Sequence, residues 1–214
     1  NAMALRREAD ITKCSTALMP AIAESYMMLD SGAALGRGNG PLLVRRRGER
    51  MPIRHVAVPG EHTTANALVM RLFHDIEQRT PMLFSDIAKA VERGEFDAGV
   101  LIHEGRFVFE RENLELVADL GLEWERVMGL PLPLGSIVAA RDMDEATIAA
   151  FEALLRESIA YAFAHPMVSR DYVKSHAREL DDDVIDKHIA LFVNDFSLSL
   201  GDEGRRAVEA LIRQ

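Results

Sequence analysis

The stretch FDAGVLIHEGRF, residues 96–107, contains the side chains of this sequence best placed to do chemistry. A continuous apolar run ends at His103, and Glu104 and Arg106 follow directly. In α/β proteins the residues after a buried strand face the crevice where ligands bind. Because the imidazole pKa is about 6.5, His103 suits a general base or acid at neutral pH. A structural histidine with one hydrogen bond explains the position equally well, and Glu104 with Arg106 also fits a solvated surface pair.

A second candidate site lies in VPGEHTTANAL, residues 58–68. A strand, a Pro-Gly turn and hydroxyl side chains at a helix start form an arrangement that binds anions, because backbone N–H groups and the positive end of the helix dipole point outward there. Thr63 and Thr64 could add hydroxyl donors to a bound carboxylate. The simpler interpretation is that one of these threonines caps the helix.

The remaining motifs are weaker. Ser15 directly follows the strand-like DITKC and therefore lies at another strand end. The glycines of ALGRGNGP, residues 34–41, do not lead into a helix, so we interpret them as a turn or hinge and not as a nucleotide loop. A histidine–glutamate pair without a second histidine four residues on is not a zinc motif, and no G-x-S-x-G motif of a serine hydrolase occurs.

The elements that must position these residues alternate between strands and helices, which predicts an α/β fold with mostly parallel sheets. Strands are expected at 10–14 and 96–102, among others, and a long amphipathic helix runs from Asp144 to His165. Further helix starts are expected at Ser85 or Asp86, at Asp182 or Asp183, and at Asp202. Two lobes and a single doubly wound sheet both fit this pattern.

The composition of the chain indicates which kinds of binding partner are not expected. The net charge is -9, and the densest basic run, Arg45 to Arg50, looks like an exposed connector, so we expect no nucleic acid partner. A single cysteine, Cys14, cannot form an internal disulfide, which makes a reducing compartment the default. No apolar run approaches the ~18 residues of a membrane span, so no membrane partner is expected.

Taken in order, the segments resemble one enzyme family along nearly the whole chain. The residues that carry this resemblance are DITKCS, SGAALGRGNGPLLV, VAVPGEHTTA, DAGVLIHEGRF, VADLG, GLPLPLGSIV, YAFAHP and VNDFSLSLGDEG. They are similar to the 1,4-dihydroxy-6-naphthoate synthases of the futalosine route to menaquinone. The resemblance implies the periplasmic-binding-protein-like type 2 fold, with a ligand cleft between two α/β lobes. Residues 1–45 and 141–214 would form the first lobe, and 46–140 the second.

The resemblance also implies a function and its residues. The expected enzyme is a cytoplasmic lyase that converts cyclic dehypoxanthine futalosine, a small-molecule carboxylate, into 1,4-dihydroxy-6-naphthoate without a cofactor or metal. The family's catalytic histidine matches His103, which would act as general base. Its substrate contacts match Thr64 and Ala65, with Thr63 adjacent, and Ser15.

The sequence departs from the family pattern at its ends. Members carry several tens of residues before the equivalent of Asn1, including a first strand, so the first lobe is expected to lack N-terminal residues as given. Two alternative functions remain open: the sister enzyme chorismate dehydratase, which lacks the histidine of HEGRF, and a non-catalytic solute-binding protein that captures a small anion.

Overall fold

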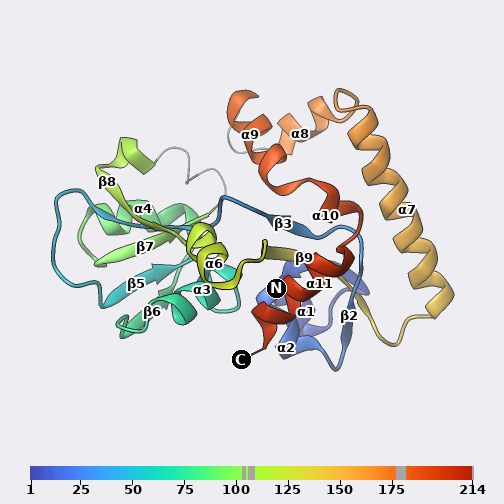
Figure 1. The fold of residues 1–214 in the computed structure, drawn as a ribbon, viewed down its shortest axis with the longest axis horizontal. Coiled ribbons are helices and arrows are strands. Elements are labelled where there is room, and N and C mark those ends of the chain that lie inside the picture. Colours follow the sequence, from blue (N-terminus) through green and yellow to red (C-terminus); the bar gives the residue numbers. More distant parts are fainter. Residues whose placement is uncertain (103–104, 106–108, 177–181, 214) are drawn as a thin grey trace. The chain divides into compact units, whose positions relative to one another are not determined.

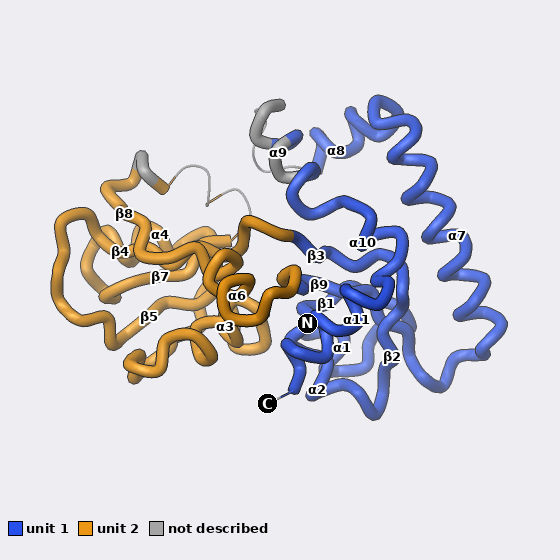
Figure 2. The backbone as a smooth tube through the Cα atoms, in the orientation of Figure 1, with its two compact units in different colours: residues 1–36, 133–214 blue, residues 37–132 orange. Residues whose placement is uncertain are grey.

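The computed structural model describes residues 1–102, 105, 109–176 and 182–213. The chain forms two compact units, which Figure 2 shows in separate colours. Unit 1 consists of Asn1–Gly36 and Pro133–Gln214, and unit 2 consists of Arg37–Leu132. Unit 2 is therefore inserted into the sequence of unit 1.

Unit 1 contains one sheet and most of the helices (Figure 1). Its elements are α1 (Ala2–Arg6), β1 (Ile11–Ser15), the short helix η1 (Thr16–Leu18), α2 (Met19–Ile22), β2 (Tyr26–Met28), β3 (Ala34–Gly36), β9 (Leu132–Ala140), α7 (Glu145–Ala164), α8 (Arg170–His176), α9 (Asp182–Phe192), α10 (Asp195–Leu198) and α11 (Gly201–Ile212). The strand order is β1-β9-β2, and β3 also pairs with β9.

Both faces of this sheet are covered, because successive side chains of a strand point to opposite sides. Cys14 and Val138 pack with Tyr26 in one apolar cluster, whereas Ala139 packs with Ile148 of α7 in another. This explains why β9 is apolar almost throughout its length.

Unit 2 contains the second sheet. Its elements are β4 (Leu42–Arg46), β5 (His55–Val58), α3 (Thr64–Leu72), β6 (Gln78–Pro81), α4 (Phe84–Glu92), β7 (Ala98–Leu101), the short helix η2 (Phe109–Glu112), β8 (Leu114–Asp119) and α6 (Leu120–Met128). The strand order is β6-β5-β7-β4-β8. All four residues of β7 are buried, and a Cβ added at Gly99 would lie 2.5 Å from Ile87 of α4. The glycine in FDAGVLI therefore lets α4 pack closely on the sheet.

The glycines of ALGRGNGP have a packing role. A Cβ at Gly40 would lie 2.4 Å from the backbone N of Gly121, and one at Gly121 would lie 2.2 Å from the carbonyl O of Asn39. The first turn of α6 thus rests directly on the backbone of residues 39–40. Asp119 caps α6 by accepting hydrogen bonds from the N–H groups of Gly121 and Leu122.

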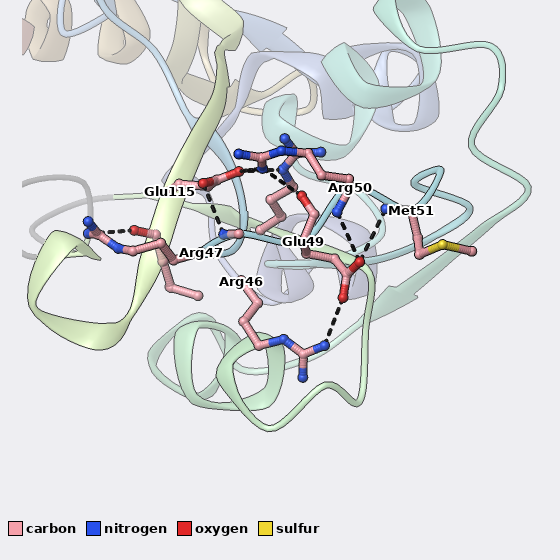
Figure 3. A network of polar contacts seen from close by, with 9 residues as sticks. Arg46, Arg47, Glu49, Arg50, Met51 and Glu115 are labelled. Atoms are coloured by element: carbon pink, nitrogen blue, oxygen red, sulfur yellow. Dashed lines mark hydrogen bonds and ion pairs between the residues drawn. The ribbon is translucent and has the colours of Figure 1, made fainter.

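Three arginines of the basic run in unit 2, Arg45, Arg46 and Arg50, pair with carboxylates (Figure 3). Glu115 accepts hydrogen bonds from Arg45 Nε at 2.8 Å and from Arg50 at 2.6 Å. The N–H of Gly48 donates to the same carboxylate at 3.1 Å. The Gly48 N–H and then Arg45 and Arg50 lower the pKa of Glu115 to about 2. These contacts hold the turn between β4 and β5 against β8.

Two expectations about the architecture need correction. Mostly parallel sheets were expected, but β9 runs antiparallel to β1 and β2, and β4 runs antiparallel to β7 and β8. Parallel pairing in the described sheets joins β5 to β6 and β5 to β7. The prediction was wrong because an apolar strand buried on both faces looks the same in either kind of sheet. A single doubly wound sheet is excluded, since there are two sheets.

The units also divide at other residues than expected. The predicted boundaries in the sequence lie between residues 45 and 46 and between 140 and 141. In the structure the chain passes from one unit to the other between residues 36 and 37 and between 132 and 133. Strand β4 belongs to unit 2 because it pairs with β7 and β8. Strand β9 belongs to unit 1 because it pairs with β1.

Helix starts were predicted with mixed success. Asp144 caps α7 by accepting from the Thr147 N–H, as expected. Helix α4 begins at Phe84, so Ser85 and Asp86 lie in its first turn, and Asp202 likewise lies in the first turn of α11. Helix α9 begins at Asp182. None of the described helices combines the length and the apolar character that a membrane span requires.

Candidate functional site

The start of α3 forms the best-defined part of the candidate site. The chain leaves β5 at Val58, turns at Gly60 with a φ of +146°, and enters the helix through Thr63, which has extended backbone angles. The Thr63 hydroxyl donates to the Gly60 carbonyl at 2.8 Å and accepts from the Asn66 N–H at 3.2 Å. The capping interpretation of Thr63 is therefore confirmed, and its side chain fixes the geometry of the turn.

Thr64 and Ala65 form the first turn of this helix, and each is only 3% exposed. Among the described residues, no acceptor receives the Ala65 N–H. The positive end of the helix dipole lies at the same place, so a carboxylate bound there would gain a hydrogen bond and a favourable field.

Asn66 adds a polar group that the sequence reasoning missed. Its Nδ2 donates to the Glu61 carbonyl at 2.8 Å, while its Oδ1 is buried without a hydrogen-bond partner. An unpartnered buried oxygen costs free energy, so this residue is placed to accept a hydrogen bond. Nothing in the sequence marks it, because asparagine in a helix is usually a solvated residue.

The strand that leads toward His103 lies next to this helix start. β5 and β7 are parallel neighbours, with Val56 beside Ala98 and Ala57 beside Gly99. Neighbouring parallel strands end at the same edge of a sheet, so the turn after Val58 and the chain after Leu101 emerge at one edge. His103, Glu104 and Arg106 themselves lie outside the described residues, and the role of His103 stays a prediction.

Ser15 ends β1 in unit 1. Its N–H donates to Asn1 Oδ1 at 2.8 Å, and its hydroxyl accepts from Asn1 Nδ2 at 3.1 Å. A serine hydroxyl can accept and donate at once, so this arrangement leaves the hydroxyl proton available for a further acceptor.

Two neighbours of Ser15 differ in chemistry. Burial raises the pKa of the Cys14 thiol, which packs among apolar residues, as expected for a core cysteine. Lys13 lies two residues before Ser15, on the same face of β1, and is exposed. No carboxylate forms a salt bridge with Lys13 within the described ranges. The sequence reasoning missed this cation because a lone lysine in a short strand is usually only solvated.

No group of three or more His, Cys, Asp or Glu residues in the described part of the chain is arranged to hold a metal ion.

Comparison with known proteins identifies the family. A family model described as menaquinone biosynthesis matches residues 1–214. The chain belongs to this menaquinone-biosynthesis family. It is 44% identical to a 1,4-dihydroxy-6-naphthoate synthase from Thermus thermophilus, over 100% of this chain and 79% of the relative. It is 39% identical to the synthase of the same name from Streptomyces coelicolor, over 99% of this chain and 77% of the relative.

Solved structures support the same fold. A crystal structure of an Archaeoglobus fulgidus protein matches with a TM-score of 0.91 and 32% identity, over 98% of this chain and 79% of that chain. A Candida albicans protein with the generic periplasmic binding protein fold matches with a TM-score of 0.67 and 11% identity, over 98% of this chain and 75% of that chain. The expected periplasmic-binding-protein-like fold is therefore confirmed.

Membership of the menaquinone-biosynthesis family also bears out the enzyme class expected from the sequence. The relatives are named as synthases, and this chain is accordingly an enzyme of menaquinone biosynthesis.

Proposed function

We propose that this protein is a 1,4-dihydroxy-6-naphthoate synthase, a carbon–carbon lyase that acts on cyclic dehypoxanthine futalosine in the futalosine route. The observation that carries the proposal is the 44% identity to a synthase of that name over the whole chain. The donor-rich start of α3 supports it independently, because the substrate is a carboxylate.

The substrate carboxylate is bound at the start of α3. There the Ala65 N–H lacks an acceptor among the described residues, and Thr64 lies directly before it. Thr63 keeps this turn in shape through its two hydrogen bonds and need not touch the substrate. Ser15 of unit 1 stays a proposed substrate contact, because its hydroxyl proton is left available for an acceptor.

His103 acts as the general base. It removes a proton from a carbon of the bicyclic part of the substrate, and the electron pair left behind forms a ring double bond as the neighbouring carbon–carbon bond breaks. The sugar-derived portion leaves with the electron pair of the broken bond and takes up the proton held by His103, and the ring becomes aromatic. Aromatisation supplies the driving force, so the protein mainly needs a positioned base and an anchored substrate. The reaction uses neither a metal nor a redox cofactor in this proposal, and it takes place in the cytoplasm.

The test is an assay of the purified protein with cyclic dehypoxanthine futalosine, with naphthoate followed by chromatography. We expect turnover by the wild type and its loss in His103→Ala. The matched control is His176→Ala, since His176 is an exposed histidine of α8. If His103→Ala retains turnover, His103 is not the base.

The same samples separate the two rival functions. Conversion of chorismate, with no reaction of the futalosine derivative, would favour the chorismate dehydratase. Saturable binding of small carboxylates without turnover of either compound would favour the solute-binding protein.

A further inference from the structure

Unit 2 contains a hollow at the end of α3, opposite the start of the helix at which the substrate carboxylate is proposed to bind. Its lining comes from the end of α3 and the residues that follow, from β8 and from α6. The hollow has a volume of about 560 Å³ and is open to solvent. Figure 1 shows α3 beside α6 in this unit. Sites for small molecules measure roughly 300–1,000 Å³, so the hollow has the size of such a site.

Part of the lining is apolar and accessible. Phe73 follows α3, Val117 lies in β8 and Val127 lies in α6. Phe73 and Val117 are partly buried, and Val127 is 56% exposed. An apolar ligand that covers these side chains removes their surface from water, which favours binding. The phenyl ring of Phe73 favours a flat aromatic ligand, because aromatic rings attract each other and a rigid ligand loses little conformational freedom.

The charged part of the lining has an excess of positive charge. Of the described residues that line the hollow, Arg71, His74 and Arg126 are basic and Glu123 is acidic. The Glu123 carboxylate is paired, since its Oε2 accepts from Nε and Nη2 of Arg126 at 3.0 and 2.9 Å. Even with His74 neutral, the described lining carries more positive than negative charge, although the net charge of the chain is -9. The hollow therefore favours an anion over a cation.

The guanidinium of Arg71 is held in position at the hollow. Its central carbon lies 5.7 Å from the centroid of the Trp124 ring, and Trp124 is fully buried in α6. This cation–π contact restricts the guanidinium before a ligand arrives. A guanidinium has five N–H donors in one plane, so it can bind a carboxylate beside the contacts that it already makes. A ligand in the hollow thus meets fixed donors and apolar side chains together.

We propose that this hollow binds a hydroxylated aromatic carboxylate, with its rings against Phe73, Val117 and Val127 and its carboxylate on Arg71. The last carbonyls of a helix have no partner within it, and those of α3 suit hydroxyl donors on the same ligand. The inference rests on the lining and not on the proposed reaction, although the naphthoate product of that reaction belongs to the same chemical class. The nine residues of α3 separate the hollow from the start of the helix by about 13 Å, so the two sites are distinct.

Titration with 6-hydroxy-2-naphthoate tests the inference. We expect calorimetry to give a Kd on the order of 1 mM or lower, which is usual for a ligand of this size. The control ligand 2-naphthol lacks the carboxylate and should bind at least about tenfold more weakly. Trp124 reports where the probe binds, because it is the single tryptophan and its indole N–H donates to the Pro131 carbonyl at 3.1 Å. Its indole resonance in a proton–nitrogen NMR spectrum should shift with the same Kd.

Variants at one exposed position test the charge of the ligand. Val127→Glu places a carboxylate in the hollow and should weaken binding of the probe at least about tenfold, whereas Val127→Lys should leave it unchanged or strengthen it. Arg71→Gln should also weaken binding at least about tenfold. The matched control is Arg93→Gln, since Arg93 is an exposed arginine of the same unit at the end of α4, and it should bind as the wild type does. Circular dichroism checks that all four variants fold.

Three results would each overturn the proposal. The first is a lack of binding at several millimolar probe, and the second is 2-naphthol binding as tightly as the carboxylate. The third is equal affinity in Val127→Glu and Val127→Lys with an unshifted indole resonance, which would place the probe elsewhere, such as the start of α3. A protein that binds the probe as expected but does not convert the futalosine derivative would refute the proposed function and support this site.

Discussion

The contact between α6 and residues 39–40 predicts a large difference between two glycines of the same helix. Gly121 lies in the first turn of α6 with ordinary backbone angles, and an added Cβ would lie 2.2 Å from Asn39 O and 2.6 Å from Gly40 N. Gly129 follows the last turn with a φ of +66° and has no atom within 4 Å of an added Cβ. A side chain at position 121 would clash with neighbouring backbone atoms, whereas a side chain at position 129 would have space but an unfavourable backbone conformation.

The expected costs follow from these geometries. Placing an extra side-chain atom in a packed interior costs about 1–3 kcal/mol. The upper end of this range applies here, because the atoms that the new Cβ would meet belong to the backbone and cannot rotate away as a side chain can. Any shift of α6 also disturbs the hydrogen bonds to the Asp119 cap, worth about 1 kcal/mol. Gly121→Ala should therefore lower the free energy of unfolding by roughly 3–4 kcal/mol. Gly129→Ala should cost only about 1–2 kcal/mol, the penalty of a left-handed alanine.

Urea unfolding measures both values. The single tryptophan of the sequence, Trp124, is fully buried in α6, so its fluorescence reports on this helix. The two variants should differ in the urea concentration at the unfolding midpoint, and the dependence of the unfolding free energy on urea concentration should be unchanged. A Gly121→Ala variant that is no less stable than Gly129→Ala would refute the close backbone contact.

Three further predictions concern single polar side chains. Thr63→Val removes the hydroxyl that caps α3, so we expect the free energy of unfolding to fall by about 0.5–2 kcal/mol. We also expect a higher KM for the proposed substrate. An unchanged KM would show that this turn is not part of the substrate-binding site. Asp30 accepts hydrogen bonds from Arg205 and Ser199, both at 2.6 Å. Asp30→Asn should therefore lower the free energy of unfolding, measured in urea, by about 1–2 kcal/mol. A decrease of less than half that value would count against a stabilising role for these hydrogen bonds. The depressed pKa of Glu115, about 2 in the folded chain, means that its stabilisation is present above its ordinary pKa of 4.5 and is lost as pH falls from there toward 2. The stability difference between wild type and Glu115→Gln should shrink over that window, and a constant difference would contradict the pKa assignment.

Local signals in the sequence predicted the elements with clear starts and ends. Asp144 and the proline after His165 defined α7 closely, and Thr63 was correctly identified as one of two possible caps. Strand direction could not be predicted in this way. An apolar strand such as β9 is buried whether its neighbours run parallel or antiparallel, and its direction follows from pairing with residues more than a hundred positions away. The site was predicted only where a side chain ends a strand or starts a helix, so Lys13 and Asn66 were missed.

The insertion of unit 2 has a consequence for how the protein folds during synthesis. Strand β1 is completed at Ser15, but its partner is not made until Gly135 and the residues after it. Until then the edge of β1 remains open to other chains, a known route to aggregation. Unit 2 is made entirely within this interval, and the chain near its two ends lies together, since a Cβ added at Gly40 would lie 3.1 Å from the Leu132 side chain. Folding of unit 2 first therefore shortens the loop that β1 and β9 must close about fivefold, which lowers the entropic cost of that closure by about 1–2 kcal/mol. The inserted unit thus acts as a folding aid for the sheet that it interrupts.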